Sequence, residues 1–290
     1  MRILILGATG MLGHKLYQLL SRRHTVFATI RGNYSSLEKF QIFQRNNIIE
    51  NTEANSIEKI TEAIITVKPD VVINCIGIIK QLKEAKNFKT SIYINSLFPH
   101  LVSEITSGLG IKFIHISTDC VFSGKKGNYN ENDLSDAEDL YGKTKALGEV
   151  VYDKKTLTIR TSIIGRELQS SVSLLDWFFS QEGKTINGYT NAIYTGFTTN
   201  SLVSVIERII VQFPELHGLY QISSDPISKY NLLEIVKKQF NLNVNIKPYD
   251  DFLCDRSLDS TLFRNTTQFI PPIWEDMIAE LANDKTVYNK

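Results

Sequence analysis

Residues 1–20 read MRILILGATGMLGHKLYQLL, and this stretch decides the fold. Its apolar run over residues 3–6 predicts a buried strand, and its leucines at helical spacing predict a helix directly after that strand. Gly7, Gly10 and Gly13 lie between the two. In such a turn the first glycine permits the tight bend, the second lets the backbone approach a pyrophosphate, and the third lets the helix pack close to the strand. The glycine triplet in this setting predicts a dinucleotide at the helix N-terminus.

The same alternation of strands and helices continues to about residue 165. Strands are predicted at 2–6, 25–30, 47–50, 71–76, 112–117 and 156–161, and helices at 11–22, 56–67, 91–109 and 140–152. This order predicts an α/β, doubly wound fold with a parallel sheet. Several of the strands are apolar throughout, as in a sheet that is covered on both faces. We therefore expect a dinucleotide-binding domain over 1–165, with a returning segment at about 197–225.

After residue 165 the pattern loosens. Helices are predicted at about 171–181, 199–212 and 230–240, a strand near 218–222, and a loop rich in Gly, Asn and Tyr at 187–196. Residues 166–196 and 226–290 are predicted to form a smaller C-terminal lobe that binds the substrate. A short helix is expected near Trp274, and the final NDKTVYNK is expected to be a frayed tail.

Composition favours a protein that acts on small molecules. The 290 residues carry a net charge of +1 and are 42% hydrophobic, as in ordinary globular proteins. There is no basic run interleaved with aromatics, so neither nucleic acid nor an anionic membrane surface is expected as a partner. No apolar run approaches about 18 residues, and the first residues form a strand rather than a cleavable signal. The three cysteines have neither metal-site nor disulfide spacing. We therefore expect a cytoplasmic protein with no metal site.

The pair Tyr141 and Lys145 is the clearest candidate for catalysis. Four residues apart on a predicted helix, the two side chains project from the same side. A phenol with a pKa of about 10 is a poor acid at neutral pH, but a nearby ammonium favours phenolate and lowers that pKa. A fall of about 3 units needs about 4 kcal/mol, which Lys145 and a cationic nicotinamide can supply together. Such a pair alone more often marks an amphipathic surface, and the glycine turn is what favours the catalytic interpretation.

Several motifs carry a family resemblance over most of the chain. They are GATGMLG at 7–13, Asn74 with Gly77 after the fourth strand, STDCVFSG at 117–124, YGKTKALGE at 141–149, IRTS at 159–162 and GLYQISS at 218–224. Together they resemble the extended short-chain dehydrogenase/reductases, and within them the dTDP-4-dehydrorhamnose reductases and related nucleotide-sugar reductases. The resemblance implies that Thr118 is the hydroxyl partner, Tyr141 the proton donor, and Lys145 the residue that binds the nicotinamide ribose.

The chemistry of that trio is also reasonable in itself. Reduction of a ketone needs a hydride from one side and a proton for the oxygen that becomes an alkoxide. Thr118 can hydrogen-bond the carbonyl oxygen and hold it beside Tyr141. Without the motif, Thr118 would be interpreted as a threonine that caps a turn at a strand end.

The end of the second predicted strand indicates the cofactor. Folds that prefer NAD place an acidic residue there, on the ribose 2′-hydroxyl. This chain reads HTVFATIRGN and has no acid, and Arg31 can pair with a 2′-phosphate. We predict NADPH, with NADH possible, although Arg31 could also begin a solvated loop. The residues expected to contact the cofactor are Gly7, Thr9, Gly10, Met11, Leu12, Gly13, Arg31, Cys75, Ile76, Gly77, Tyr141 and Lys145.

Cys120 bears on the type of reaction. By resemblance, nucleotide-sugar 4,6-dehydratases have a glutamate after their Thr-Asp pair, and a thiol is a poor substitute for that acid, so dehydration is not expected. GDP-fucose synthases pair such a cysteine with a histidine for epimerisation, but no histidine lies between His115 and His217. The dTDP-4-dehydrorhamnose reductases usually have tyrosine here, so the sugar stays open. Cys120 could contact the substrate or simply fill the core.

The substrate is expected between the two lobes. Arg256 is a candidate to clamp a diphosphate, because a planar guanidinium can bridge two phosphate oxygens. Lys80 and Gln81 follow the strand end NCIG, where strand C-termini meet the cleft. Each could equally be solvated surface. The full set of candidate substrate contacts is Lys80, Asp119, Cys120, Asn191, Tyr194, Thr198 and Arg256.

These observations lead to one expected function and two alternatives. The expectation is NADPH-dependent reduction of the C4 ketone of a nucleotide-diphosphate 4-keto-6-deoxy sugar, in deoxysugar or surface polysaccharide biosynthesis. The first alternative is a nucleotide-sugar 4-epimerase that holds NAD tightly. The second is a noncatalytic nucleotide-binding subunit, because the regulatory subunit of methionine adenosyltransferase shares this fold and similar motifs. The resemblance also implies a homodimer, paired through the helices at about 91–109 and 140–152.

Overall fold

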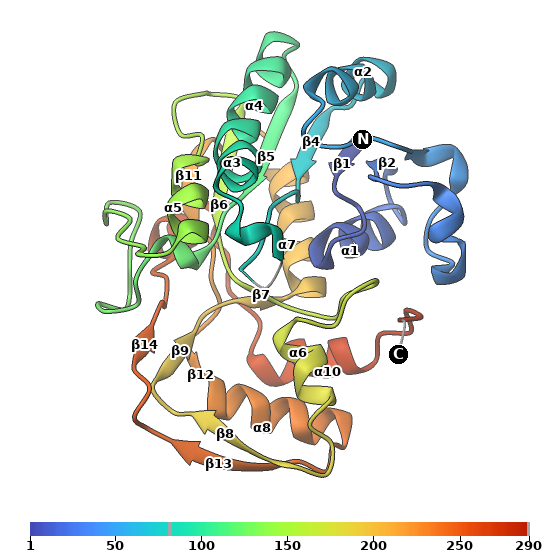
Figure 1. Ribbon diagram of the computed structural model, residues 1–290. Coiled ribbons are helices and arrows are strands. Elements are labelled where there is room, and N and C mark those ends of the chain that lie inside the picture. Colours follow the sequence, from blue (N-terminus) through green and yellow to red (C-terminus); the bar gives the residue numbers. More distant parts are fainter. Residues whose placement is uncertain (81–82, 289–290) are drawn as a thin grey trace.

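Seven parallel strands form the central sheet of the protein (Figure 1). The computed structural model describes residues 1–80 and 83–288, so Gln81 lies outside the described residues. In spatial order the strands are β11 (Gly218–Gln221), β6 (Thr156–Arg160), β5 (Lys112–Ile116), β4 (Val71–Asn74), β1 (Arg2–Leu6), β2 (Thr25–Thr29) and β3 (Ile48–Ile49). Every neighbouring pair in this sheet is parallel. The predicted doubly wound α/β fold is confirmed.

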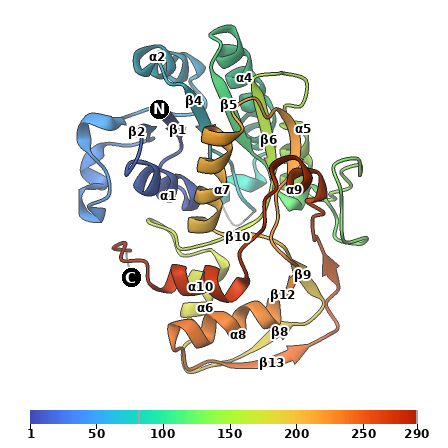
Figure 2. The same ribbon diagram turned by 180° about the vertical axis from the view of Figure 1, so that it is seen from behind.

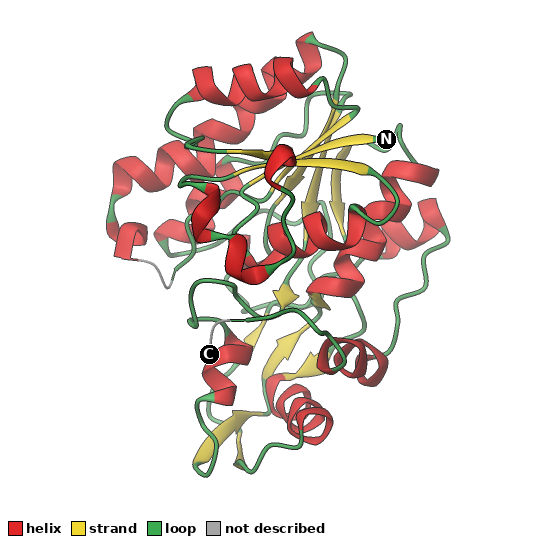
Figure 3. Ribbon diagram, turned by 90° about the vertical axis from the view of Figure 1, so that its right-hand side faces the viewer, coloured by secondary structure: helices red, strands yellow, loops and turns green. Residues whose placement is uncertain are grey.

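Helices cover both faces of the sheet because its strands are apolar on both sides (Figure 3). In β1, Ile3 and Ile5 face one layer, which includes α1 (Met11–Leu20) and α7 (Thr199–Gln212). Leu4 and Leu6 face the other layer, which includes α2 (Ile57–Val67) and α4 (Phe98–Gly108). The alternation of these four side chains in a single strand therefore fixes the two layers.

The strand order reverses beside β1, which pairs with β2 on one side and with β4 on the other. Connections that leave β1 and β4 run in opposite directions across the sheet, and this leaves a crevice at the carboxyl ends of the strands. The glycine turn follows β1 at this edge. Sequence elements that follow β4 and β5 reach the same edge, so the topology brings the candidate residues together.

Two of the predicted helices differ from expectation. The predicted helix at 91–109 consists of α3 (Phe88–Ser91), a π-helical stretch η5 (Ile92–Leu97) and α4. The helix predicted to end at 152 is α5 (Leu140–Leu147), which ends at Gly148. A Cβ on Gly148 would lie 1.9 Å from the carbonyl oxygen of Asn95, so this close approach requires glycine.

The smaller lobe lies below the sheet domain in Figure 1. It contains α6 (Leu174–Phe179), α8 (Lys229–Phe240), the strand pair β8 (Thr185–Tyr189) and β13 (Asn245–Tyr249), and a sheet of β12 (Ile227–Ser228), β9 (Ala192–Tyr194) and β14 (Cys254–Asp255). The segment at 187–196, predicted as a loop, thus holds β9 and the end of β8. Glycine and asparagine interrupt these short strands, which removed the periodic signal.

The remaining elements are short or join the two lobes. The strands β7 (Ile163–Ile164) and β10 (Phe197–Thr198) pair with each other, and α10 (Trp274–Ala282) contacts both α7 and α8 (Figure 2). α9 (Thr261–Thr267) packs on β11 and so belongs with the sheet domain, unlike the predicted lobe boundary. Single helical turns are η1 (Tyr34–Ser36), η2 (Glu38–Phe40), η3 (Arg45–Asn47), η4 (Lys83–Lys86) and η6 (Asp119–Val121).

The C-terminal tail is docked, through Tyr288, rather than frayed. Asp284 forms a salt bridge of 2.5 Å with the buried Lys15 of α1, and the ring of Tyr288 packs edge-on against His14. The guanidinium of Arg166 lies 4.3 Å from the centre of the Tyr288 ring. In Figure 2 the segment that follows α10 accordingly runs below α1. A polar-looking tail gives no sequence signal of this docking, because the partners are distant in the chain.

Over residues 1–80 and 83–288, no helix is long and apolar enough to cross a bilayer. The same residues contain no group of three His, Cys, Asp or Glu side chains that could hold a metal ion.

Candidate active site

The glycine turn has the geometry of a phosphate-binding turn. Gly7 has a φ of +87°, and a Cβ there would lie 2.8 Å from a side-chain carbon of Ile76. A Cβ on Gly13 would lie 2.2 Å from the carbonyl oxygen of Gly7, so the third glycine lets α1 pack against the turn. A Cβ on Gly10 would meet only the oxygen of Gly7, at 3.6 Å. The second position is therefore open on the side from which a ligand would approach.

The first turn of α1 has no side-chain cap. Gly10 is the N-cap residue, makes no side-chain hydrogen bond, and is not followed by an acidic residue in the first turn. The N–H groups of Met11, Leu12 and Gly13 then have no intrahelical partners, as in any helix start. Together with the positive end of the helix dipole, they suit an anion such as a pyrophosphate. Thr9 is partly buried beside this turn. These residues fit a dinucleotide.

The neighbouring strands contribute the other predicted cofactor contacts. Cys75 and Ile76 directly follow β4 and are partly buried, while Gly77 is exposed. The hydroxyl of Thr29, at the end of β2, accepts a hydrogen bond of 3.3 Å from the Gly7 N–H. Arg31 lies two residues beyond and is exposed, free to meet a ligand at this edge. The predicted contacts thus gather at the carboxyl ends of β1, β2 and β4.

The predicted catalytic trio lies at the same edge of the sheet. Thr118 follows β5 and accepts a hydrogen bond of 3.1 Å from the Cys120 N–H, which begins the turn η6. Asp139 caps α5 by accepting a hydrogen bond of 2.8 Å from the Gly142 N–H, and this fixes the start of the helix that carries Tyr141 and Lys145. The Thr118 hydroxyl lies close enough to Tyr141 to lower its pKa.

The pKa of Tyr141 corrects one expectation. Burial raises it well above the usual range, and Cys120 and Asp119 raise it further, against the hydrogen bond with Thr118. The ammonium of Lys145 donates a hydrogen bond of 2.8 Å to the carbonyl oxygen of Ile116. In the protein without ligand, the tyrosine is therefore a neutral phenol that holds its proton. A lowered pKa stays a prediction for the complex with the cofactor.

Lys145 is unusual because it is a nearly fully buried lysine. It is 4% exposed, and burial lowers its pKa to about 8, although Glu149 and Cys75 act to raise it. Its Nζ lies 3.5 Å from Nε2 of His115, a buried histidine whose pKa burial holds well below the usual range. Sequence reasoning missed His115 as a site residue. The available signal was a polar residue inside the otherwise apolar strand KFIHI.

Two positive side chains from different elements lie at Tyr141 and at the neighbouring Cys120. The ammonium of Lys80 lies 5.6 Å from the centre of the Tyr141 ring and 2.6 Å from a carboxylate oxygen of Asp139. Arg256 follows β14, donates 2.8 Å to the carbonyl oxygen of Phe122, and lies 4.0 Å from the sulfur of Cys120. Lys80 therefore lies over the ring of Tyr141, while Arg256 lies beside the neighbouring Cys120.

Cys120 and Asp119 lie inside this cluster. Burial raises the pKa of the Cys120 thiol to about 12, and Asp119 raises it further, so the thiol stays protonated at neutral pH. Asp119 is 8% exposed and accepts a hydrogen bond of 3.0 Å from the Thr118 hydroxyl. A neutral thiol cannot shuttle a proton as a carboxylate does.

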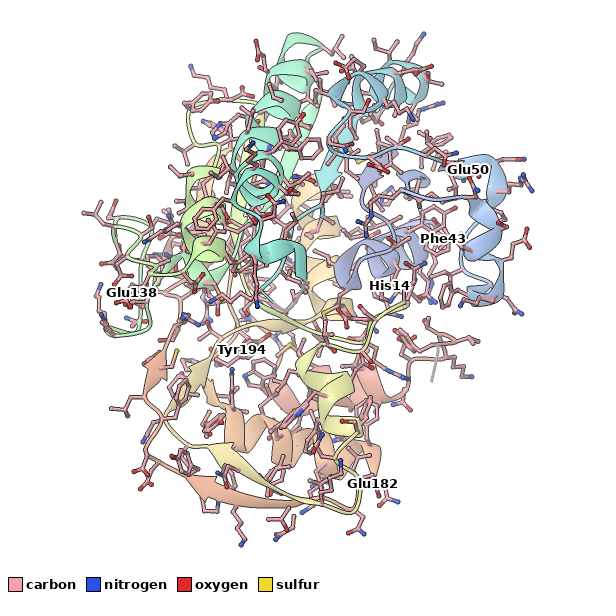
Figure 4. The ribbon with its side chains drawn as sticks, viewed as in Figure 1. His14, Phe43, Glu50, Glu138, Glu182 and Tyr194 are labelled. Carbon is pink, nitrogen blue, oxygen red and sulfur yellow. The ribbon has the colours of Figure 1, made fainter. Side chains whose placement is uncertain are left out.

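The three candidates from the segment 191–198 have different outcomes. Tyr194 lies between the sheet domain and the small lobe (Figure 4), where burial raises its pKa and Asp119 and Cys120 are near enough to raise it further. Asn191 is exposed and donates 2.9 Å to the carbonyl oxygen of Asp250, within the lobe. Thr198 is fully buried, and its hydroxyl caps α7. We therefore correct the expectation for Thr198, whose role is structural.

Comparisons with known proteins agree with this geometry. A family model described as the RmlD substrate binding domain matches residues 1–286. The chain is 26% identical, over 78% of its length and 74% of the relative, to dTDP-4-dehydrorhamnose reductase of Aggregatibacter actinomycetemcomitans. It is 28% identical, over 86% of its length and 75% of the relative, to methionine adenosyltransferase 2 subunit beta of Mus musculus.

Solved structures share the fold. The crystal structure of dTDP-4-dehydrorhamnose reductase from Bacillus anthracis in complex with NADP superposes with a TM-score of 0.78 at 21% identity. The superposition covers 97% of this chain and 98% of that one, so both lobes have counterparts in it.

Proposed function

The chain belongs to the RmlD substrate-binding family, and on that premise we propose that it is an NADPH-dependent reductase of nucleotide sugars. The reaction is reduction of the C4 ketone of a nucleotide-diphosphate 4-keto-6-deoxy sugar, in deoxysugar or polysaccharide biosynthesis. One observation carries the proposal. Thr118, Tyr141 and Lys145 lie together at the carboxyl edge of the sheet, where the uncapped glycine turn of α1 also lies.

The chain's own residues account for the proton side of the reaction. When bound, NADPH supplies the hydride. Thr118 donates a hydrogen bond to the ketone oxygen and orients it, and Tyr141 delivers the proton to the same oxygen. Lys145 then stabilises the phenolate that remains. The raised pKa of Tyr141 suits this direction, because the acid is fully protonated before the reaction starts.

The charges around Tyr141 support an anionic substrate. Lys80 lies over the tyrosine ring and Arg256 beside Cys120, and a nucleotide diphosphate carries negative charge that a guanidinium can bind in two places. Asp119, Cys120 and Tyr194 are proposed to line the sugar end, and Asn191 remains a proposed contact at the outer end of the lobe. Arg31 is proposed to favour NADPH over NADH by pairing with the 2′-phosphate.

A panel assay tests the proposed function. NADPH oxidation is followed at about 340 nm with dTDP-, GDP- and UDP-linked 4-keto-6-deoxy sugars, and Tyr141→Phe is expected to lower kcat by about 100-fold or more while NADPH still binds. Tyr152→Phe is the matched control, because Tyr152 is 71% exposed and the substitution keeps the aromatic ring that the dimer proposed below would use. Full activity of Tyr141→Phe would reject the proposed proton donor.

One alternative has support from a specific relative. The match to methionine adenosyltransferase 2 subunit beta favours a noncatalytic, nucleotide-binding subunit as the second candidate. This candidate predicts that the protein binds NADPH but reduces no sugar in the panel. It also predicts that the protein changes the kinetics of a partner enzyme, which a pull-down followed by an activity measurement would detect.

We also propose a homodimer that acts in the cytoplasm. Support for the dimer comes from apolar side chains exposed on η5, on α5 and just beyond α5: Ile92 (47%), Leu97 (46%), Leu147 (68%), Val151 (51%) and Tyr152 (71%). Light scattering should give twice the mass of 33.0 kDa, and Leu147→Glu should give the monomer.

The free cysteines Cys75, Cys120 and Cys254 suit a reducing compartment.

A further inference from the structure

A buried polar chain runs beneath Lys145 from β4 to β5. Nδ2 of Asn74 lies 3.1 Å from Nδ1 of His115, and Nε2 of His115 lies 3.5 Å from Nζ of Lys145. Asn74 and His115 are paired across the two strands, and both are fully buried. Neither side chain has a role in the reaction proposed above. Burying two polar groups at the strand ends is unfavourable unless they are paired, so their arrangement calls for a reason.

The hydrogen bonds of Asn74 decide which nitrogen of His115 carries the proton. The Ile76 N–H can only donate, and it donates 3.0 Å to Oδ1 of Asn74. The amide nitrogen of Asn74 must therefore face His115, and because an amide nitrogen only donates, Nδ1 of His115 accepts. The neutral imidazole then has its proton on Nε2. That N–H points toward the amine of Lys145.

A donor aimed at a lysine affects its two charge states differently. A neutral amine can accept this N–H, whereas an ammonium has three donors and no acceptor. The ammonium of Lys145 also has a firm partner in the Ile116 carbonyl oxygen, at 2.8 Å. The other groups that act on Lys145 are Glu149, at the end of α5, and Cys75, after β4, and both favour the charged form. The N–H of His115 acts in the opposite direction and disfavours the charged form of Lys145.

We propose that His115 is a positioning residue that Asn74 locks as the Nε2–H tautomer, so that it aims a hydrogen-bond donor at Lys145 and sets the protonation balance of this lysine. This inference rests on the proposed function, in which Lys145 stabilises the Tyr141 phenolate. An ammonium whose close acceptor is a neutral carbonyl oxygen rather than a carboxylate keeps its charge available for the phenolate. Its low pKa, about 8 with burial as the largest cause, is consistent with this arrangement.

The tautomer can be measured without any turnover. In long-range ¹H–¹⁵N NMR of the protein labelled at its 5 histidines, the His115 signals are identified by their loss in His115→Phe. The expected pattern is a neutral Nε2–H imidazole from about pH 6 to about pH 9. An Nδ1–H tautomer or an imidazolium at pH 7 would overturn the proposal. The tautomer itself is measured in the folded wild-type chain, and His115→Phe serves only to assign the signals.

A second experiment inverts the donor. In Asn74→Asp the carboxylate only accepts, so Nδ1 of His115 must carry the proton and Nε2 becomes an acceptor for the ammonium of Lys145. The lysine pKa is then expected to rise by about one unit, so that kcat/KM falls about 2-fold between pH 7 and pH 9 instead of about 10-fold. Ile114→Val, in the same strand but packed on the opposite face, is the control and should keep the wild-type profile.

The outcomes separate this inference from the proposed function. If His115 in Asn74→Asp carries its proton on Nδ1 but kcat/KM still falls about 10-fold between pH 7 and pH 9, the proposed role of His115 is wrong, whatever the substrate is. If no sugar is reduced, the pH dependence of the NADPH dissociation constant replaces kcat/KM, because Lys145 is expected to bind the nicotinamide ribose. An unchanged pH dependence of binding in Asn74→Asp would then count against His115 alone.

Discussion

Lys15 and Lys145 are both almost fully buried, at 1% and 4% exposure, but their surroundings differ. Lys15, on α1, forms a 2.5 Å salt bridge with Asp284 and 2.7 Å hydrogen bonds with Gln18 and Thr286. Lys145, on α5, donates to a carbonyl oxygen and faces the N–H of His115. Among the described residues, no carboxylate forms a salt bridge with Lys145.

The difference separates a charge that the fold neutralises from one that is proposed to act in the reaction. A buried cation is costly unless it is paired, and Lys15 has the partners that such a charge needs. Lys145 lacks a carboxylate partner, which leaves it destabilising for the fold but able to interact with a phenolate or a ligand. Burial lowers the pKa of both lysines, to about 8 for Lys145, and for Lys15 the hydrogen bond to Asp284 opposes this effect. We therefore expect opposite consequences when each is removed.

The largest expected effect is the loss of activity in Lys145→Met. Without the ammonium of Lys145, the phenolate of Tyr141 loses the cation that is proposed to stabilise it, and kcat is expected to fall by about 100- to 1000-fold in the NADPH oxidation assay. The same variant should be more stable than wild type by about 1 to 3 kcal/mol at pH 7, because it no longer buries a charge without a carboxylate partner. Denaturant unfolding measures the second effect. A variant that is both inactive and destabilised would contradict the comparison.

The second effect concerns stability and should be seen in Lys15→Met. Asp284 would then be buried without its cation, and the free energy of unfolding is expected to fall by about 3 kcal/mol. kcat is expected to stay within about threefold of wild type, since Lys15 has no role in the proton transfer. In the double variant Lys15→Met with Asp284→Leu, most of the lost stability should return. If the double variant is as unstable as the single one, the salt bridge is not the reason.

This contrast was only half visible in the sequence. Tyr141 and Lys145 could be found because both lie on one helix, four residues apart, and the glycine turn could be found because its residues are contiguous. Asp284 could not be linked to Lys15, because the contact spans 269 positions and the tail carries no periodic pattern.

Other differences have the same physical origin. His115 and Asn74 become neighbours only through the pairing of β4 with β5, so their contact is a property of the sheet register. The burial of Tyr141 raises its pKa, and burial depends on every element that packs around it. Thr198 looked like a polar residue in a loop but caps a helix in the core. Local motifs therefore predicted the position of the site, while its electrostatics needed the three-dimensional structure.

The third prediction is the pH dependence of kcat/KM, which reports the free enzyme. With a Lys145 pKa of about 8, the ammonium is mostly present at pH 7 and mostly absent at pH 9, so kcat/KM should fall about 10-fold over that interval. The stability of the fold is expected to change with pH in the opposite direction. Because the folded pKa is lower than that of the unfolded chain, the charge destabilises the fold most below pH 8, and this penalty disappears as the pH rises toward 10.5.

Lys145→Met is the control for this pH dependence. The variant should lack the increase in stability that deprotonation of Lys145 gives the wild type at alkaline pH. The difference in the free energy of unfolding between wild type and variant should therefore shrink from about pH 7 to about pH 10. Lys112, whose pKa burial also lowers to about 8, contributes equally to both proteins and cancels in the difference. A difference that is constant with pH would mean that Lys145 does not titrate in this range.

The smallest effect is expected for a third lysine that is paired but exposed. Lys125 forms a 2.6 Å ion pair with Glu138, and the two side chains are 76% and 75% exposed. Water and salt screen such a pair, and holding two long side chains in place offsets much of the attraction. Lys125→Met should therefore show no measurable change in the denaturation midpoint or in kcat. A clear loss of stability in Lys125→Met would mean that an ion pair stabilises the fold whether or not it is buried. An unchanged denaturation midpoint, together with a lower stability of Lys15→Met, would mean that the contribution of the pair depends on burial.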